Sequence, residues 1–378
     1  MDTRTGYHFG LRIEMSRWVL GSSKKRLRPL IADTEFLWCY YKGYLCRASY
    51  ELDILESVAR FPMGGRLDRL GRNFRPLERV FRLAPSNGIQ AGRKLYFSRR
   101  SEIFVYDLDT GWLSSDFVIP RGRRALQLGL VGGADRFEKV VFGEYFHNLA
   151  RKSVRIWGRS NSSNHWEVLG EFPEGEIEHI HAVVEIDEMV FILCGDFDHC
   201  ASIWETDREF SFLRPLLRGN QSCRAAWIEK IGGTLIYATD SQLEKNHLRE
   251  LRLDEGTPIS NEVQSIEGSS IYCGKGHGNH FFSTTVEGGL PTGNFLVDSL
   301  DRRRGRGIFS SWAKIYSLDS DVVCEEVFSA KKDIWPFRLG QFGTFTFPSG
   351  VQPTGLVVAY ATALSGIDDT CFVFRKCH

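Results

Sequence analysis

The chain repeats a unit of four short strand-like segments, and this repeat limits its fold more than any other feature. The clearest copy, residues 176–219, reads EHIHAVVEI, EMVFILCGD, ASIWETD and FSFLRPLL. These segments are rich in Val, Ile, Phe and Trp and are bounded by Gly, Asp or Pro, as expected of strands joined by tight turns. Seven such units follow one another at a spacing of roughly 40–50 residues, namely 31–62, 79–122, 123–175, 176–219, 222–267, 270–333 and 340–378.

This spacing predicts an all-β fold, a β-propeller of four-stranded antiparallel blades. A four-stranded sheet cannot bury both faces alone, so the blades must pack face to face around an axis. We predict seven blades, with six as the alternative. The last unit lacks an outer strand, and the N-terminal segment 6–20 would supply it and close the ring, so that no strand edge is left open.

A parallel α/β fold is disfavoured because it would need a crossover helix after each strand. Helical periodicity is scarce, and the best helical candidate is a short, weakly apolar segment at 239–250. We therefore predict one β-propeller domain over residues 1–378.

The composition limits the partners of the chain. Its formal net charge of +1 gives no global attraction to nucleic acid or to an anionic membrane, and the basic run 301–307 is expected in a solvated loop. No apolar run could span a bilayer, and the N-terminal sequence lacks the plan of a secretory signal. The nine cysteines show neither a C-x-x-C pair nor a disulfide framework, so a reducing, cytoplasmic setting is expected.

One turn of the repeat resembles the Asp-box of sialidase-like propellers, whose pattern is S-x-D-x-G-x-T-W. Segments 46–58 and 202–216 look like worn copies, and the fullest copy is RIWGRSNSSNHWEVL at 155–169, with similar places held by Ser160, Ser162, Asn164 and Trp166. It is one residue short and lacks the aspartate. The resemblance implies the sialidase-like propeller superfamily, and the tryptophan is expected to anchor the turn against a neighbouring strand.

Sialidases use three arginines that bind a carboxylate, a Tyr–Glu nucleophile pair and an aspartate acid, so the resemblance suggests Glu144 and Tyr145 as a candidate pair. Adjacent residues on a strand point to opposite faces, so these two need a bulge to act together. The early Arg-Ile-Pro motif of the family is also missing. Sialidase activity itself is therefore not predicted.

In a propeller the innermost strand of each blade lines the central channel, and the loops at one rim form the usual pocket. His179 and His181 are two residues apart on the inner strand of unit 176–219, so both face one side of it. Such a pair can bind a metal, or can serve in acid/base catalysis and substrate binding. The alternative is two structural histidines bonded to loop carbonyls.

Three acids complete the predicted catalytic set: Glu144, Asp196 and Asp240. Asp196 follows a strongly apolar strand, and Asp240 follows LIYAT in the same register of the next unit. Acid/base cleavage of a glycosidic bond requires two carboxyl groups across the sugar. The alternative is that these aspartates cap turns at strand ends.

Arg224 is the main candidate for binding a substrate carboxylate, because a guanidinium group binds planar anions in a bidentate manner. A salt bridge between blades is the alternative. Trp335 is predicted to stack on a sugar face, and the alternative is a position in the core. The predicted substrate-binding residues are Tyr145, Gln221, Arg224, Glu287, Lys332 and Trp335, and further polar residues at similar places are His277, His280 and Gln341.

His and Gln side chains gathered at a channel mouth resemble the Mn²⁺ site of propeller-type pectate-fragment lyases, which makes a divalent metal a candidate cofactor; the sequence assigns no ligand set. We predict a carbohydrate-active propeller that binds, and as an enzyme cleaves, an acidic oligo- or polysaccharide as a glycoside hydrolase or lyase. The alternative is a non-catalytic propeller that binds a protein or glycan as a scaffold. The chain lacks the Trp-Asp dipeptide typical of WD-repeat scaffolds.

Overall fold

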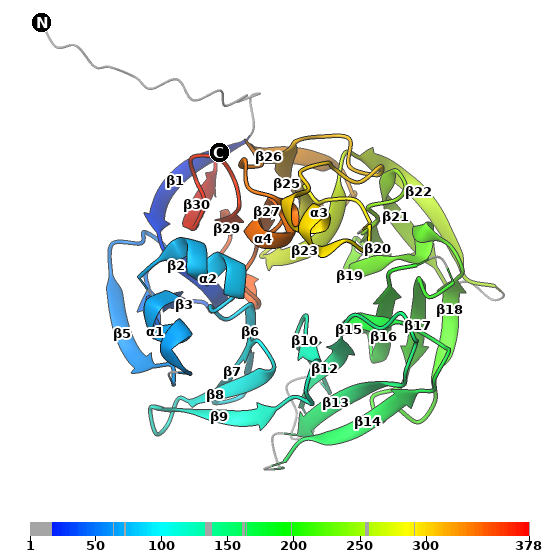
Figure 1. Ribbon diagram of the computed structural model, residues 1–378, viewed down its shortest axis with the longest axis horizontal. Coiled ribbons are helices and arrows are strands. Elements are labelled where there is room, and N and C mark those ends of the chain that lie inside the picture. Colours follow the sequence, from blue (N-terminus) through cyan, green and yellow to red (C-terminus); the bar gives the residue numbers. More distant parts are fainter. Residues whose placement is uncertain are drawn as a thin grey trace, which may run out of the picture.

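The computed structural model describes residues 17–62, 64–71, 73–132, 138–160, 163, 165–197, 199–253, 257–290 and 292–377. It confirms the predicted all-β propeller. Seven antiparallel blades of four strands surround a central axis (Figure 1), and two of them carry one additional short strand.

The first three blades follow the chain in order, each from its inner to its outer strand. Blade 1 consists of β2 (Leu27–Ala32), β3 (Leu37–Tyr41), β4 (Tyr44–Ala48) and β5 (Leu55–Arg60). Blade 2 consists of β6 (Asn87–Ala91), β7 (Lys94–Arg99), β8 (Glu102–Asp107) and β9 (Trp112–Val118). Blade 3 has a divided inner strand and consists of β10 (Arg124–Ala125), β11 (Gly129–Val131), β12 (Lys139–Tyr145), β13 (Val154–Ser160) and β14 (Glu167–Phe172).

Blades 4 to 6 repeat the same order. Blade 4 consists of β15 (His179–Ile186), β16 (Met189–Gly195), β17 (Ser202–Thr206) and β18 (Arg214–Arg218). Blade 5 consists of β19 (Ala225–Ile231), β20 (Thr234–Thr239), β21 (Asn246–Arg252) and β22 (Ile259–Ile266). Blade 6 consists of β23 (Ser269–Gly276), β24 (Asn279–Thr285), β25 (Trp312–Leu318) and β26 (Cys324–Lys331), and β28 (Val351–Gln352) pairs in parallel with β23.

Blade 7 is built from both ends of the described chain. Its strands are β27 (Thr344–Thr346), β29 (Leu356–Thr362), β30 (Thr370–Lys376) and β1 (Trp18–Lys25), from the axis outward. β1 pairs antiparallel with β30, so an N-terminal strand closes the ring as predicted. The strand is placed later than the expected segment 6–20, of which residues 6–16 lie outside the described residues.

The predicted helix at 239–250 is wrong, because Asn246–Arg252 forms β21. The preceding turn is held by side chains that bond to nearby backbone groups. The Asn246 amide oxygen accepts from Ser241 N at 2.8 Å, and the Ser241 hydroxyl accepts from the N–H groups of Leu243 and Glu244. Such local bonds satisfy the backbone outside a helix.

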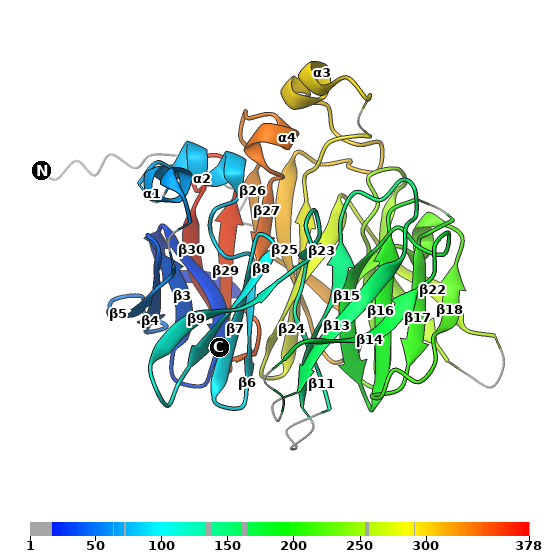
Figure 2. The same ribbon diagram turned by 60° about the horizontal axis from the view of Figure 1, so that its bottom comes forward.

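Short helices occur in the loops between strands instead. They are α1 (Arg66–Gly71), α2 (Arg75–Phe81), α3 (Phe295–Leu300), α4 (Phe337–Gly340) and the 3₁₀ helix η1 (Gln221–Cys223). Figure 2 shows that α1 to α4 lie on one face of the ring, and that α3 projects furthest from it. Among the residues described, no helix has the length and apolar character needed to cross a membrane.

The core lies between neighbouring blades. Trp166, the last residue of the motif that resembles an Asp-box, is 9% exposed and stacks on Phe117 of blade 2 with ring centroids 5.4 Å apart. Its indole N–H donates to Asp116 at 2.7 Å. Because buried aromatic side chains contribute large apolar areas, this tryptophan stabilises the contact between blades 2 and 3. Ser162 and Asn164 lie outside the described residues.

Candidate functional site

A cavity of about 550 Å³ lies on the axis of the ring. Its position follows from its lining, because every blade contributes a residue on its inner strand or just before it. These residues are Arg28, Ser86, Arg124, His181, Arg224, Tyr272 and Thr344, from blades 1 to 7 in that order. The first strands therefore face the axis, as the repeat predicts.

His179 and His181 reach this region because β15 is irregular at its start. The pairing of β15 with β16 shifts between Ile180 and Ala182, which places His181 at a β-bulge. Bulges re-aim side chains next to functional sites. Both imidazole rings are 2% exposed. A Cβ on Gly195, at the end of β16, would lie 2.3 Å from Cε1 of His181, so the glycine makes room for the ring.

Hydrogen bonds of the two Nδ1 atoms determine which tautomer each histidine adopts. Nδ1 of His179 lies 3.1 Å from the carbonyl oxygen of Phe146, and Nδ1 of His181 lies 2.8 Å from that of Ala225. A carbonyl oxygen only accepts, so each Nδ1 must carry a hydrogen. In a neutral ring, Nε2 then presents a lone pair.

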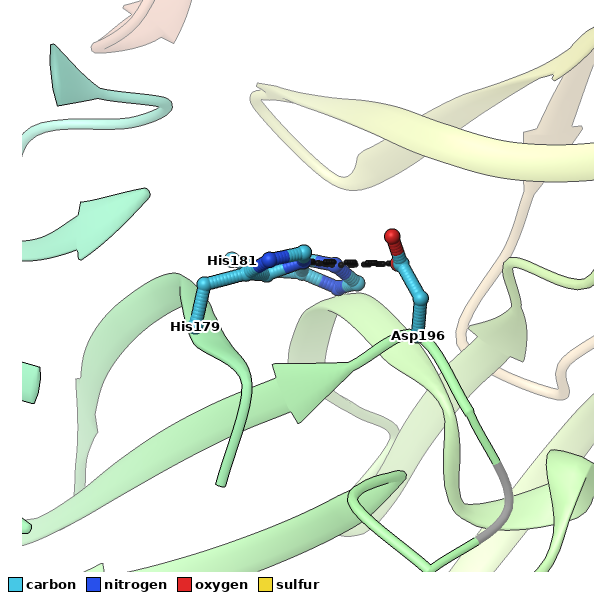
Figure 3. Close-up of side chains that lie close together, drawn as sticks. All are labelled: His179, His181 and Asp196. Atoms are coloured by element: carbon cyan, nitrogen blue, oxygen red, sulfur yellow. Dashed lines mark hydrogen bonds and ion pairs between the residues drawn. The ribbon is translucent and has the colours of Figure 1, made fainter. Parts of the chain in front are cut away.

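These lone pairs converge with a carboxylate oxygen (Figure 3). The two Nε2 atoms are 3.1 Å apart, and Oδ1 of Asp196 lies 3.4 Å from Nε2 of His179 and 3.2 Å from Nε2 of His181. Three acceptors at this spacing repel one another unless a proton or a metal cation lies among them.

The spacing fits a metal. Two ligand atoms at about 2.1 Å from one ion, with an angle between octahedral and tetrahedral values, are about 3.0–3.4 Å apart. The Nδ1–H bonds to carbonyl oxygens match the supporting interactions of metal-binding histidines. The three residues could therefore hold a divalent cation and leave its remaining positions open to the cavity.

Arg224 joins this cluster to further acids. Its Nη2 lies 2.9 Å from Asp196 Oδ1 and 3.7 Å from Asp240 Oδ2. Within the described part of the chain, Nε of Arg224 and Oδ1 of Asp240 are buried and lack a hydrogen-bond partner. Both residues line the cavity, so both have polar groups that a ligand could satisfy.

The two aspartates have opposite pKa shifts. Burial opposes ionisation of Asp196, but Arg224 and the two histidines hold its pKa well below the ordinary value. Burial raises the pKa of Asp240 to about 7, with Arg224 acting against the shift and Glu287 adding to it. Carboxyl groups whose pKa values are pushed apart are typical of acid–base sites. Asp240 is thus ready to exchange a proton near neutral pH.

Tyr145, Gln221 and Glu287, which the sequence predicts as substrate-binding residues, lie beside this cluster. The Tyr145 ring lies 4.2 Å from that of His179, and the Arg124 guanidinium lies 4.8 Å from the Tyr145 centroid. Gln221 donates to the carbonyl oxygen of Asp196 at 3.0 Å and accepts from Ser241 at 2.7 Å. Glu287 accepts from Ser269, and burial raises its pKa. The structure thus brings together His179, His181, Asp196, Asp240, Tyr145, Gln221, Arg224 and Glu287.

Glu144 does not join this cluster. It is fully buried on the other face of β12 from Tyr145, where it binds Arg123, the indole N–H of Trp157 at 3.0 Å and the backbone N–H of Arg155 at 3.0 Å. These bonds occupy both carboxylate oxygens. The period of the strand separates the two neighbours, as expected without a bulge.

Lys332 and Trp335 also lie outside the cavity lining. Lys332 donates to Asp333 and to the carbonyl oxygen of Trp335, while the Trp335 side chain is exposed. Of the further polar residues, Gln341 lines the cavity, but His277 and His280 do not.

The structure adds residues that the sequence did not single out: Arg82, Arg124 and Tyr272. Arg124 and Tyr272 belong to inner strands, so the blade repeat itself could have indicated them. Arg82 follows α2, which the sequence analysis did not predict.

The architecture and cavity define a seven-bladed β-propeller with an axial polar site. No protein-family model matches the chain, and no curated protein matches it either. Among solved structures, it is similar over 94% of its length to 90% of an oligogalacturonate lyase in complex with manganese, with a TM-score of 0.56 and 8% identity.

Two further neighbours share this architecture. A chain of the mitotic checkpoint complex aligns over 99% of both chains with a TM-score of 0.53 and 9% identity. The AfRom2 CNH domain aligns over 95% of this chain and 98% of that one, with a TM-score of 0.50 and 9% identity. At these identities the likeness shows the fold alone.

Proposed function

We propose that this protein is a lyase that binds an acidic oligosaccharide in the axial cavity and cleaves it by β-elimination. The observation that carries the proposal is the convergence of His179 Nε2, His181 Nε2 and Asp196 Oδ1, beside Arg224. His179, His181 and Asp196 would hold a divalent cation such as Mn²⁺, which would supply positive charge for a substrate carboxylate.

Elimination suits these residues because the proton to be removed from a uronic acid lies on C5, next to the carboxylate. The Arg224 guanidinium neutralises that carboxylate and so makes the C5 proton more acidic. A base removes the proton, its electron pair forms the C4–C5 double bond, the C4–O glycosidic bond breaks, and the leaving oxygen takes a proton from solvent. The products are one unsaturated and one saturated sugar.

Asp240 is the group that we assign as base. A pKa of about 7 is near the optimum for proton transfer at neutral pH, and Oδ1 is free to accept within the described cavity. Hydrolysis by a Tyr145–Glu144 pair is disfavoured because these side chains lie on opposite faces of β12 and Glu144 is bound by Arg123. The substrate and metal named for the lyase neighbour agree with the proposal.

The proposal is tested with purified protein, Mn²⁺ and a panel of galacturonate, glucuronate and mannuronate oligosaccharides. Ultraviolet absorbance of the unsaturated product measures elimination, and loss of the free Mn²⁺ resonance signal measures metal binding. We expect Mn²⁺-dependent product formation, at least about 100-fold slower in Asp240→Asn. His181→Ala should lose Mn²⁺ binding, and the exposed Glu171→Gln should match the wild type. Absence of both product and Mn²⁺ binding in the wild type would refute the proposal.

A second candidate function, a scaffold for a protein partner, is favoured by the surface of α3. Its side chains Phe295, Leu296 and Leu300 are 67%, 72% and 67% exposed, on the face that carries the helices (Figure 2). Large exposed apolar groups gathered on one short helix are typical of interaction sites. Under this function, a stoichiometric partner is lost in Phe295→Ser/Leu296→Ser and kept in His181→Ala.

A further inference from the structure

Two arginines that line the cavity, Arg82 and Arg124, have neither a counter-ion nor a hydrogen-bond acceptor for their guanidinium groups among the described residues. The other cavity arginines differ. Arg75 binds Asp368 and Glu78, and Arg224 binds Asp196. Arg28 donates to Pro85 O and Tyr360, and Arg100 lies 3.8 Å from Asp68.

The two unpaired groups line the same cavity, and the charge of one acts on the other. Burial lowers the pKa of Arg82, and the charge of Arg124 lowers it further, whereas Tyr272 and Tyr145 act against this shift. Two neighbouring cations without an anion are unfavourable in a partly desolvated cavity. An anion between them would remove this cost.

The backbone of Arg82 adopts a conformation that is unfavourable for a residue with a side chain. It caps the C-terminus of α2 with φ of 49°, a left-handed conformation that usually selects Gly or Asn. α2 is itself attached to distant residues, because Arg75 binds Asp368 and Arg79 binds Asp333. Strained residues held by such contacts are concentrated at ligand-binding sites.

Tyr145 connects this pair to the metal-binding cluster. Its ring centroid lies 4.8 Å from Arg124 Cζ and 4.2 Å from the ring of His179. The guanidinium of Arg124 is therefore at most about 9 Å from the centroid of the His179 ring, and both groups contact the Tyr145 ring. An aromatic face of this kind can contact a sugar ring while its neighbours bind charged groups.

We propose that Arg82 and Arg124 form a second carboxylate subsite, so that the cavity selects ligands with two negative charges, such as a run of at least two uronic acid residues. The subsite itself rests on the two unpaired arginines, and its use by an oligouronide rests on the proposed function.

The subsite is tested first with bromide. Crystals of the whole protein soaked in bromide should show an anomalous peak between the two guanidinium groups, and crystals of Arg82→Gln/Arg124→Gln should lack it. The exposed Arg93→Gln, whose partner Asp109 lies outside the cavity, is the matched control and should keep the peak. Absence of the peak in the wild type overturns the subsite.

The ligand is tested by calorimetry with galacturonate and digalacturonate, in the Asp240→Asn background with Mn²⁺ so that nothing is cleaved. The dimer should bind at least about tenfold tighter than the monomer, a difference of about 1.4 kcal/mol. Arg82→Gln/Arg124→Gln should reduce the ratio below about threefold and leave Mn²⁺ affinity unchanged. An unchanged ratio overturns the selection for two charges. A bromide peak without uronide binding supports the subsite and counts against the proposed function.

Discussion

His181 and Gly195 fit together only because position 195 has no side chain. A Cβ there would lie 2.3 Å from Cε1 and 2.7 Å from Nε2 of His181. The glycine that ends β16 is therefore part of the candidate metal site, although it offers no ligand atom.

Gly195→Ala should displace His181 and weaken Mn²⁺ binding by at least about tenfold. The added methyl group also overpacks a buried region, which costs about 1–3 kcal/mol of stability. Titration followed by Mn²⁺ resonance and urea denaturation measure the two effects. Gly170→Ala is the control, because a Cβ there meets its nearest neighbour at 3.6 Å. Unaltered Mn²⁺ affinity in Gly195→Ala would show that the contact does not position His181.

The stability of the metal-free protein should fall as the pH rises from about 4 to about 7. Asp240 has a pKa of about 7 in the fold, against an ordinary value of 3.8. Between these values the folded state keeps a proton that the unfolded chain has released, so the free energy of unfolding decreases with pH, by at most about 4 kcal/mol from Asp240. Burial also raises the pKa of Glu287, which adds to the slope in the same direction. Asp196 acts in another window: its lowered pKa costs stability only as the pH falls below about 4.

Urea denaturation across this pH range, in the presence of a chelator, measures the slope. Asp240→Asn should reduce the slope, and the exposed Asp109→Asn should follow the wild type. A slope that Asp240→Asn leaves intact would mean that another group holds the proton.

Glu144→Gln should destabilise the fold without changing metal binding. The substitution leaves the guanidinium of Arg123 without its buried partner and alters the bond from Trp157. Loss of one member of such a pair costs about 3–5 kcal/mol when both are buried, and somewhat less here because Arg123 is 20% exposed. Glu171→Gln, in a half-exposed pair with Arg155, should cost less than about 1 kcal/mol. Denaturation and Mn²⁺ titration of both variants provide the comparison; a stable Glu144→Gln with impaired metal binding would contradict this assignment.

Trp166→Ala should lower the stability of the fold by weakening the contact between blades 2 and 3. The indole packs on Phe117 and Phe142 and donates to Asp116, so its removal should cost about 3–5 kcal/mol. Trp112, which is 72% exposed in blade 2, is the matched control, and Trp112→Ala should cost less than about 0.5 kcal/mol. Equal melting temperatures for the two variants would show that Trp166 does not stabilise the contact between blades 2 and 3.

The propeller could be predicted because the sequence patterns that indicate it are local. Short apolar runs and turn residues recur along the chain, and a first strand that faces the axis brings its polar residues to one cavity. His181 on β15 and Tyr272 on β23, with Arg224 directly before β19, line the cavity for this reason. The same alternation places Glu144 and Tyr145 on opposite faces of β12.

Arg82 could not be predicted in this way. Its position depends on α2, and α2 is held by Asp333 and Asp368, which lie more than 250 residues away along the chain. The helix predicted at 239–250 is absent for a local reason. Hydrogen bonds of Ser241 and Asn246 to nearby backbone groups outweigh a weak helical pattern. Contacts of both kinds depend on individual side chains that periodicity does not report.

The pairing of β1 with β30 affects how the protein can fold during its synthesis. β1 leaves the ribosome before any other described strand, and its partner β30 is the last described strand to follow. The nascent chain must therefore carry β1 without its partner while all the other described strands are made, and an unpaired strand edge promotes association with other chains.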